Sequence, residues 1–233
     1  MLLPRDLTTK IRFLMDELLP PIIRDSKWFM SIPLKLVLKN NASFFMNFKD
    51  TAWQLSAKEY QEQYEKINAQ ETRKTDLNSA CVREIQKTIS GETVLEVGSG
   101  KGYLATELAR KYKVTATDLV VDKQLKETYP NITCINANVE KLPFADRSFD
   151  TVICTHTLEH VQNISRAVSE LRRVTKNRLI VVVPKQRPYR YTFDLHLHFF
   201  PYTFSLVAIM NNGEPSQSHC QEVSGDWFYY EDL

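Results

Sequence analysis

Hydrophobic residues recur at helical spacing through the first ninety residues of the chain, without an internal repeat. The first such set predicts an amphipathic helix that stops before Pro20, and it consists of Ile11, Leu14, Met15, Leu18 and Leu19. Ser56 and Glu59 have the spacing of a capping box at the start of another helix. A further helix is predicted from about Asn78 to Ile89, just before Gly91.

From Thr93 onward, short apolar runs alternate with helical segments, which is typical of a parallel α/β sheet. The predicted strands are 93–97, 113–117, 132–136, 149–154 and 178–183, followed by a last strand in DWFYYE. The predicted helices are 102–111, 122–128, 163–175 and a short one near 202–210. We therefore predict an α/β fold: a doubly wound, Rossmann-like, mostly parallel sheet with helices on both faces. This domain would span residues 78–233, after a helical N-terminal extension over residues 1–77.

Three alternate glycines, Gly98, Gly100 and Gly102, follow the first predicted strand in the stretch TVLEVGSGKGY. A glycine turn between a strand and a helix lets the backbone approach a nucleotide-like ligand closely. The helix that follows can bind a phosphate or a carboxylate at its amino end. Asp118 ends the second predicted strand, where a carboxylate can accept hydrogen bonds from both ribose hydroxyls. The spacing G-x-G-x-G, with Glu96 two residues before it, differs from the dinucleotide fingerprint G-x-G-x-x-G.

Further motifs follow along residues 78–210: TDL, the pair LPF and SFD, LEHV and HLHFF. Together with VLEVGSGKG they resemble the motifs of class I S-adenosylmethionine-dependent methyltransferases. The similarity is greatest to the small-molecule enzymes that include quinone-biosynthesis and sugar methyltransferases. It implies a Rossmann-like fold, S-adenosyl-L-methionine as cofactor, and methyl transfer to a small-molecule, glycan or lipid-linked acceptor.

The resemblance also implies a role for each matching position. The methionine part of the cofactor would be surrounded by Glu96, Gly98, Ser99, Gly100 and Gly102, and flanked by Thr155 and His156. Asp118 would bind the ribose, and the adenine would contact Leu119, Asn138, Val139 and Glu140. Asn138 departs from the family pattern, which usually has Asp there. Because an Asn carbonyl oxygen can accept the same hydrogen bond from the adenine amino group, we expect weaker binding rather than none.

Methyl transfer from a sulfonium mainly requires that the acceptor be aligned with the methyl group and that water be excluded. An acceptor hydroxyl or amine would also benefit from a nearby base. The candidate side chains near the expected cleft are His156, His160, Asp194, His196 and His198. Of these we favour His160 and His198, because one follows the fourth strand and the other lies in an aromatic segment suited to a lid. Each could equally satisfy local hydrogen bonds only.

Two alternatives remain open on the sequence. His156, Glu159 and His160 match the inverted zinc-hydrolase pattern H-x-x-E-H, which requires both histidines on one face of a long helix. Here the pattern follows a buried strand directly, so we predict no metal site. The second alternative is a regulatory or scaffold protein that binds S-adenosylmethionine without turnover. We favour the active enzyme because every cofactor position holds a usable residue.

Composition and charge exclude several other classes of protein. The net charge of +2 and the absence of a basic face or an exocyclic-amine methylation motif argue against nucleic acid as a partner. Four widely spaced cysteines without a CxxC pair favour reduced thiols and a cytoplasmic protein. The sequence predicts neither a signal peptide nor a membrane span, and it does not predict the oligomeric state.

The first forty residues carry seven Lys or Arg against four Asp or Glu, and Trp28, Phe29 and Met30 lie among them. This composition admits weak contact with a membrane surface or a lipid-linked substrate. It equally fits helices that pack on the main domain and turn a basic face to water. The charge excess is small for an interfacial helix, which favours the second interpretation.

Overall fold

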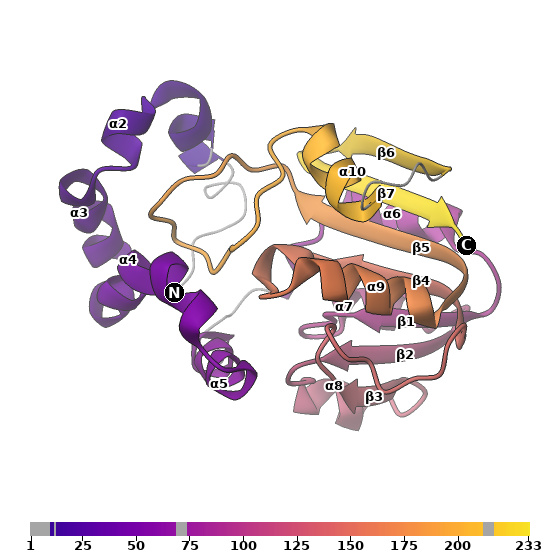
Figure 1. Cartoon of the computed structure of the whole chain (residues 1–233). Helices are drawn as coiled ribbons and strands as arrows, with labels where there is room; N and C mark the ends of the chain where they lie inside the picture. The colour runs from indigo at the N-terminus through magenta and orange to yellow at the C-terminus, as the bar shows by residue number, and fades with distance from the viewer. Residues whose placement is uncertain (1–9, 12, 69–73, 212–216) are drawn as a thin grey trace. The chain divides into compact units, whose positions relative to one another are not determined.

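The apolar runs that follow Thr93 form the strands of a seven-stranded sheet (Figure 1). The structure is a computed structural model that describes residues 10–11, 13–68, 74–211 and 217–233. Its strands are β1 (Thr93–Val97), β2 (Lys113–Asp118), β3 (Thr133–Asn136), β4 (Phe149–Thr155), β5 (Thr175–Pro184), β6 (Ser218–Val223) and β7 (Asp226–Asp232).

The strand order is β3-β2-β1-β4-β5-β7-β6. The neighbouring pairs among β1 to β5 are parallel, whereas β7 runs antiparallel to both β5 and β6. Val97, the last residue of β1, pairs with Thr117 on one side and with Cys154 on the other. The chain order therefore reverses beside the carboxyl end of β1, which is where open α/β sheets bind their ligands. The predicted mostly parallel, Rossmann-like sheet is confirmed.

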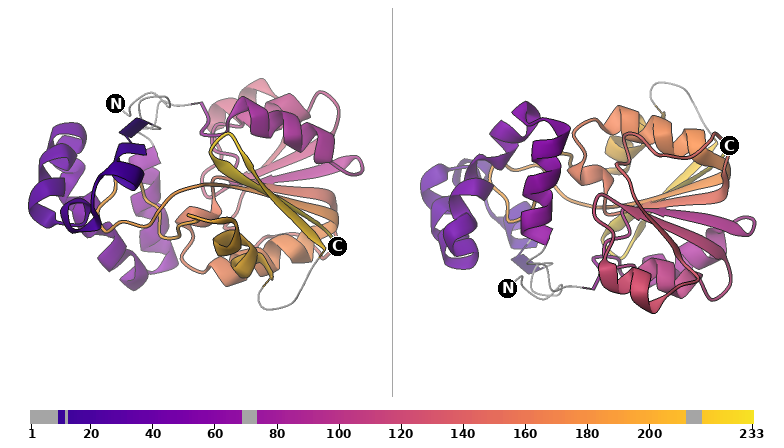
Figure 2. Two further views of the ribbon diagram at one scale, coloured as in Figure 1. Left: turned by 90° about the horizontal axis from the view of Figure 1, so that it is seen from above. Right: turned by 90° about the horizontal axis from the view of Figure 1, so that it is seen from below.

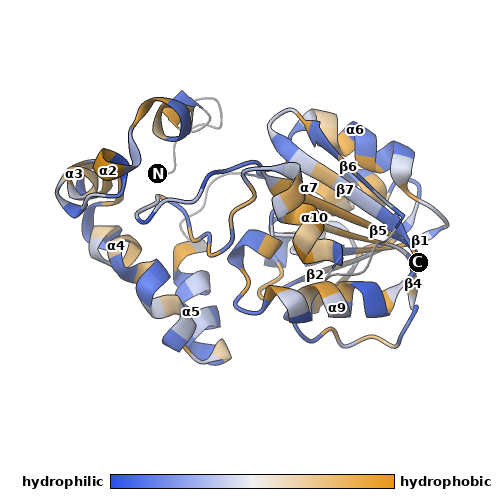
Figure 3. Cartoon of the chain, turned by 45° about the horizontal axis from the view of Figure 1, so that its top comes forward, coloured by the Kyte–Doolittle hydropathy of each residue, from blue (hydrophilic) through white to orange (hydrophobic). Residues whose placement is uncertain are grey.

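Helices cover both faces of the sheet (Figure 2). One face is covered by α6 (Ser79–Thr88), α7 (Tyr103–Leu108) and α8 (Lys123–Thr128), and the other by α9 (Ile164–Val174) and α10 (Thr203–Asn211). Polar and hydrophobic residues alternate along α9 (Figure 3), whose buried residues are Ala167, Val168, Leu171 and Val174. Such spacing gives the helix one apolar face toward the sheet and one polar face toward water.

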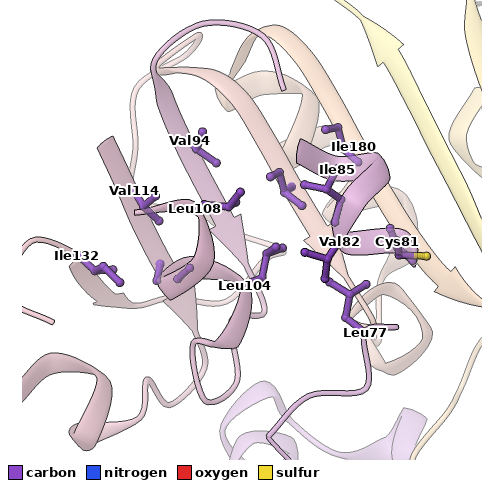
Figure 4. Packing of buried hydrophobic residues seen from close by; sticks show 14 of the residues in the cluster. Leu77, Cys81, Val82, Ile85, Val94, Leu104, Leu108, Val114, Ile132 and Ile180 are labelled. Atoms are coloured by element: carbon purple, nitrogen blue, oxygen red, sulfur yellow. The ribbon is translucent and has the colours of Figure 1, made fainter. Parts of the chain in front are cut away.

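The core under α6 and α7 shows how the glycine turn is supported. Ile85 of α6 and Leu104 and Leu108 of α7 pack with Val94 of β1 and Val114 of β2 (Figure 4). All five side chains are buried. This apolar layer fixes β1 and α7, the two elements that the glycine turn joins.

Strand β6 is the element that the sequence pattern does not predict. It precedes β7 and is joined to it by a hairpin turn at Ser224 and Gly225, whose φ angles are positive, 52° and 85°. Its sequence, SHCQEV, is mostly polar, and it occupies the edge of the sheet. An edge strand needs few buried side chains, so it carries little hydrophobic alternation for a sequence pattern to reveal.

The chain divides into two units, and the helices before residue 69 belong to the first. They are the π-helical turn η1 (Leu14–Leu18), α2 (Pro21–Arg24), α3 (Lys27–Leu38), η2 (Lys39–Asn41), α4 (Ala42–Thr51), η3 (Ala52–Gln54) and α5 (Ala57–Asn68). The predicted capping box is present at the start of α5. The Ser56 amide donates to Glu59 Oε2 at 2.8 Å, and the Glu59 amide donates to Ser56 Oγ at 3.4 Å.

Residues Gln186–Pro201 group with these helices, although the sequence pattern assigns them to the second domain. Tyr191 and Leu195 from this segment are buried in one core with Met30, Leu34 and Phe48. The second unit comprises Lys74–Lys185 and Tyr202–Leu233. The chain therefore passes from the sheet unit to the helical unit after β5 and returns before α10.

We expect the buried ion pair between α9 and β7 to contribute strongly to the stability of the sheet unit. Arg172 donates to Glu231 through Nε at 2.7 Å and Nη2 at 2.9 Å, and Tyr229 Oη donates to the same buried carboxylate at 3.0 Å. Arg172→Met should lower the free energy of unfolding by about 3–5 kcal/mol, because it leaves a buried charge without its cation.

The matched control is Lys185→Met. Lys185 pairs with Glu222 at 2.7 Å, but both side chains are partly exposed. Loss of this ion pair should lower the free energy of unfolding by about 0–1 kcal/mol. Urea unfolding followed by circular dichroism compares the two variants, and equal losses would contradict the prediction.

Candidate cofactor site

The backbone of the glycine turn is tied to the end of β2. The Gly98 and Ser99 amides both donate to the Thr117 carbonyl oxygen, at 2.8 and 2.9 Å. The Gly102 amide donates to the Ser99 carbonyl oxygen at 2.7 Å. These bonds require a backbone conformation that residues with a side chain rarely adopt, since φ is +77° at Gly98, +51° at Gly100 and +75° at Gly102.

The three glycines serve different purposes. A Cβ atom on Gly98 would lie 1.8 Å from Thr157 Oγ1, and one on Gly102 would lie 2.4 Å from the methyl groups of Leu125. Those two positions are therefore glycine because neighbouring side chains fill the space. A Cβ atom on Gly100 would meet no heavy atom within 4 Å. The space beside Gly100, at the carboxyl edge of the sheet, is therefore open. This is expected of a residue whose backbone contacts a ligand.

Asp118 lies at the carboxyl end of β2, beside this turn. Its Oδ2 accepts a hydrogen bond from the Gly100 amide at 2.8 Å, and its Oδ1 accepts a longer one from Val120 at 3.4 Å. Burial raises the pKa of Asp118, although these amides act in the opposite direction. A carboxylate oxygen can accept more than one hydrogen bond, so Asp118 retains the capacity to bind ribose hydroxyls.

Glu96 is buried in β1 immediately before the turn, and its Oε2 has no hydrogen-bond partner in the described part of the chain. Burial raises its pKa to about 8, while the Ala105 amide acts in the opposite direction. Burying such a group costs free energy unless a donor or a cation satisfies it. The α-ammonium group of a methionine moiety is a cation of the required kind, so the unsatisfied oxygen fits the cofactor.

The predicted adenine contacts lie on two loops. Leu119 follows β2 and is half-buried, whereas Val139 is buried in the loop after β3. Asn138 Oδ1 accepts a hydrogen bond from the Glu140 amide at 2.8 Å, and Glu140 Oε1 accepts one from the Asn163 amide at 2.9 Å. The Asn138 oxygen has a second lone pair for an adenine amino group.

Two residues of α9 hold the continuation of the Asn138 loop, and the sequence-based assignment of site residues does not include them. Glu170 Oε2 accepts a hydrogen bond from the Leu142 amide at 2.8 Å. Arg173 donates to the carbonyl oxygens of Leu142 and Phe144 at 3.1 and 2.7 Å, and it also pairs with Glu170. The i, i+3 pair Glu170 and Arg173 is visible in the sequence, but its attachment to a distant loop is not.

His156 and Thr155 were expected beside the methionine end of the cofactor. Thr155 is buried at the end of β4. The His156 ring lies between two carboxylates of its own unit, with Nδ1 3.4 Å from Glu159 and Nε2 3.5 Å from Asp226. Burial alone would lower its pKa, but Asp226 and Glu159 raise it to about 10. The ring is therefore a buried cation that links β4 to β7, and it is not available as a base at neutral pH.

The zinc-hydrolase pattern lacks the helix that it needs. His156 has a positive φ of 48°, and only Leu158–His160 is helical, as a short 3-10 turn. The two histidines are therefore not on one face of an α-helix, and the geometry does not support this alternative. His160 is half-buried in the sheet unit.

His198 and His196 belong to the helical unit. The His198 ring packs edge-on against Trp53, with ring centroids 5.8 Å apart. His196 is held more firmly. Its Nδ1 lies 2.6 Å from Gln186 Oε1 and 3.4 Å from Asp194 Oδ2, and Gln186 Nε2 donates to the same Asp194 oxygen at 3.1 Å. The ring of His196 is therefore held by polar contacts, although of these two histidines the sequence favours His198 as a base.

Lys49 completes this polar group in the helical unit. Burial lowers its pKa to about 8, although Asp194 and Asp25 act in the opposite direction. Its ammonium group donates to the Tyr189 carbonyl oxygen at 2.9 Å and lies 4.3 Å from the centre of the Phe199 ring. Burial alone would raise the pKa of Asp194, but His196 and Lys49 hold it below its ordinary value.

Comparison with known proteins places the cofactor turn inside a recognised domain. Residues 95–183 match the family described as "Methyltransferase domain". The chain is 34% identical to 2-phytyl-1,4-naphtoquinone methyltransferase of Trichormus variabilis over 42% of its length and 48% of that protein's. It is 28% identical to demethylmenaquinone methyltransferase of Tropheryma whipplei over 62% of its length and 63% of that protein's. The match therefore spans about half of the first relative and less than two thirds of the second.

Solved structures share the fold at low sequence identity. A protein from Pyrococcus horikoshii aligns with a TM-score of 0.58 and 15% identity, covering 72% of this chain and 98% of its own. A structure from Aquifex aeolicus titled as a SAM-dependent methyltransferase aligns with a TM-score of 0.54 and 17% identity, covering 74% of this chain and 98% of its own.

The open position at Gly100 leads to a prediction about cofactor binding. Gly100→Ala should lower the free energy of unfolding by about 1–2 kcal/mol through its positive φ alone. It should weaken binding of S-adenosylhomocysteine by roughly 5- to 150-fold, because the added methyl group takes up ligand space. Gly225→Ala is the matched control, since Gly225 also has positive φ and no atom near its Cβ, but lies in the β6–β7 turn. Calorimetry should show that Gly225→Ala binds S-adenosylhomocysteine as tightly as the wild type does. Equal weakening of binding in both variants would contradict the assignment of Gly100 to the cofactor site.

The buried Glu96 leads to a prediction about pH. Burial raises the pKa of Glu96 to about 8 in the folded protein, from an ordinary value of 4.5. The unfolded chain therefore releases this proton first, and Glu96 destabilises the ligand-free fold increasingly as pH rises from about 5 to about 8. We therefore compare the free energies of unfolding of the wild type and the Glu96→Gln variant. The value for the wild type, relative to that for the variant, should fall by about 2–4 kcal/mol over this range. Urea unfolding at several pH values tests this, and a constant difference would refute it.

The glycine turn, Glu96 and Asp118 meet at the switch point of the sheet, and they fit a cofactor with an amino-acid and a ribose part. The matched domain and the shared fold agree with this geometry. Residues 95–183 therefore belong to a methyltransferase domain, and the geometry of the glycine turn fits S-adenosylmethionine as its cofactor.

Proposed function

We propose that this chain transfers the methyl group of S-adenosylmethionine to a small-molecule acceptor. The observation that carries the proposal is the unsatisfied Glu96 oxygen beside the open space at Gly100 and the carboxylate of Asp118. A protein that bound no ligand would gain nothing from burying an unpaired carboxyl group there. The bound cofactor supplies the activated methyl group, and the protein supplies alignment and exclusion of water.

Each part of the cofactor has residues to hold it under this proposal. Asp118 accepts the ribose hydroxyls, and Glu96 faces the ammonium group, which favours its ionised form. The Gly98–Gly102 backbone and Thr155 surround the methionine chain. The adenine lies against Leu119, Asn138, Val139 and Glu140, on the loop that Glu170 and Arg173 hold in place.

The acceptor that we propose is an aromatic, quinone-like molecule, either free or linked to a lipid. The support comes from the relatives, whose names describe methylation of a phytyl-naphthoquinone and of demethylmenaquinone. A glycan acceptor remains the second class within the same reaction.

Where the acceptor must lose a proton, we propose His160 as the base. It lies in the same unit as the glycine turn, and it interacts electrostatically with Asp118. A base must come within hydrogen-bond reach of the proton that it removes, which favours a histidine of the unit that holds the cofactor.

The proposal is tested by following S-adenosylhomocysteine formation with a panel of reduced naphthoquinones, phenols and sugars. We expect turnover with the reduced naphthoquinones, and His160→Gln should lower kcat by about 10²- to 10⁴-fold without changing the affinity for S-adenosylmethionine. His219→Gln on the edge strand β6 is the matched control and should retain full turnover. Unchanged kcat in His160→Gln would exclude His160 as the base.

Two negative results have different meanings in this experiment. No binding of S-adenosylmethionine would overturn the cofactor assignment itself. Normal binding without turnover on any quinone would overturn only the acceptor class.

A further inference from the structure

Helix α3 (Lys27–Leu38) carries large apolar side chains on two opposite faces. Met30 and Leu34 are fully buried in the core of the helical unit. Trp28, Ile32 and Leu36 are instead 69, 58 and 74% exposed. Their spacing of four residues brings these three together on one side of the helix, opposite Met30 and Leu34. We call this side the α3 outer face.

This degree of exposure is not needed to fold the unit. Isolated apolar residues are common on protein surfaces, but neighbouring ones of this size usually mark a contact with another molecule. The buried side of α3 already supplies its packing on α4 through Phe45 and Phe48. The α3 outer face therefore has a function other than stability.

The charged residues of α3, and of the chain that follows it as far as Lys49, are all lysines. Between Ser26 and Lys49 the sequence contains four lysines and no aspartate or glutamate. Lys27, Lys35 and Lys39 are exposed, and Lys35 lies on the same side of α3 as Trp28, seven residues before it along the chain. A lysine can lay its apolar stem along such a face and extend its ammonium group beyond it.

We propose that the α3 outer face docks on an anionic lipid surface, with α3 lying in the plane of the interface. Tryptophan and aliphatic side chains flanked by lysines are the composition of interfacial helices. A helix of twelve residues is only about 18 Å long, so it can lie in the interface but not cross the bilayer. None of the helices in the described ranges is long and apolar enough to do so.

A second copy of the chain is a poorer occupant for the same face. Two copies paired through α3 would bring their lysines together without acidic residues to offset them. An anionic lipid surface supplies the opposite charge instead. The proposal does not depend on methyl transfer, but it deepens the proposed function, because docking would bring the enzyme to acceptors that are linked to lipids.

The experiment is cosedimentation of the full-length chain with vesicles of phosphatidylglycerol and phosphatidylcholine in equal parts. We expect binding that weakens at high salt and on pure phosphatidylcholine. The triple variant Trp28→Ser, Ile32→Ser, Leu36→Ser should lose at least about tenfold in vesicle affinity, because it removes the apolar contact. Lys27→Gln with Lys35→Gln should reduce the salt dependence.

Phe204→Ser is the matched control, because Phe204 is also 69% exposed but lies on α10 of the sheet unit. It should bind vesicles as the wild type does, and all variants should keep the wild-type circular dichroism spectrum and affinity for S-adenosylhomocysteine. Absence of vesicle binding by the wild type, or equal binding by the triple variant, would overturn the proposal. So would a concentration-dependent dimer that sedimentation velocity detects in the wild type and not in the triple variant.

Discussion

The fold of the sheet unit depends on two backbone amides that share one acceptor. The Gly98 and Ser99 amides both donate to the Thr117 carbonyl oxygen, so the chain leaving β1 is attached to the end of β2. The same attachment places the Gly100 amide against Asp118. Glycine adopts with the least strain the positive φ angles that this arrangement imposes three times in five residues. One local hydrogen-bond pattern thus positions both the turn and the carboxylate that we assign to the cofactor.

Buried acidic side chains occur at two places near the switch point, and the two places differ in whether a cation lies beside the carboxylate. Glu159 and Asp226 lie on either side of the His156 ring, which they keep positively charged, and Asp226 also accepts a hydrogen bond from Asn78 at 2.7 Å. The imidazolium offsets part of the charge of these two carboxylates, and the group joins β4, β7 and the start of α6. Glu96 is equally buried, but among the described residues it has no ion pair, and its Oε2 has no hydrogen-bond partner. A buried carboxyl group without a cation is the one that a ligand with an ammonium group would stabilise.

The sequence predicts much of this arrangement because its signals are local. β-branched runs, the glycine spacing and the capping box at Ser56 each act within a few residues, and the structure places them as expected. The function of His156 could not be predicted in this way, since Asp226 lies seventy residues further along the chain. The same holds for Arg173 and its loop, for the edge strand β6, and for the grouping of 186–201 with the helices. Each depends on a contact between distant parts of the chain, which no local pattern encodes.

The division into units explains why the family match ends where it does. The match covers residues 95–183, the part of the sheet whose loops we assign to the cofactor. All enzymes of this class use the same cofactor, so the chemistry of that part allows little variation. The acceptor differs from one enzyme to another. The helices before residue 74 and the segment Gln186–Pro201 lie outside the match and share one core. Substitutions in the helical unit therefore need not disturb the hydrogen bonds on which the cofactor turn depends.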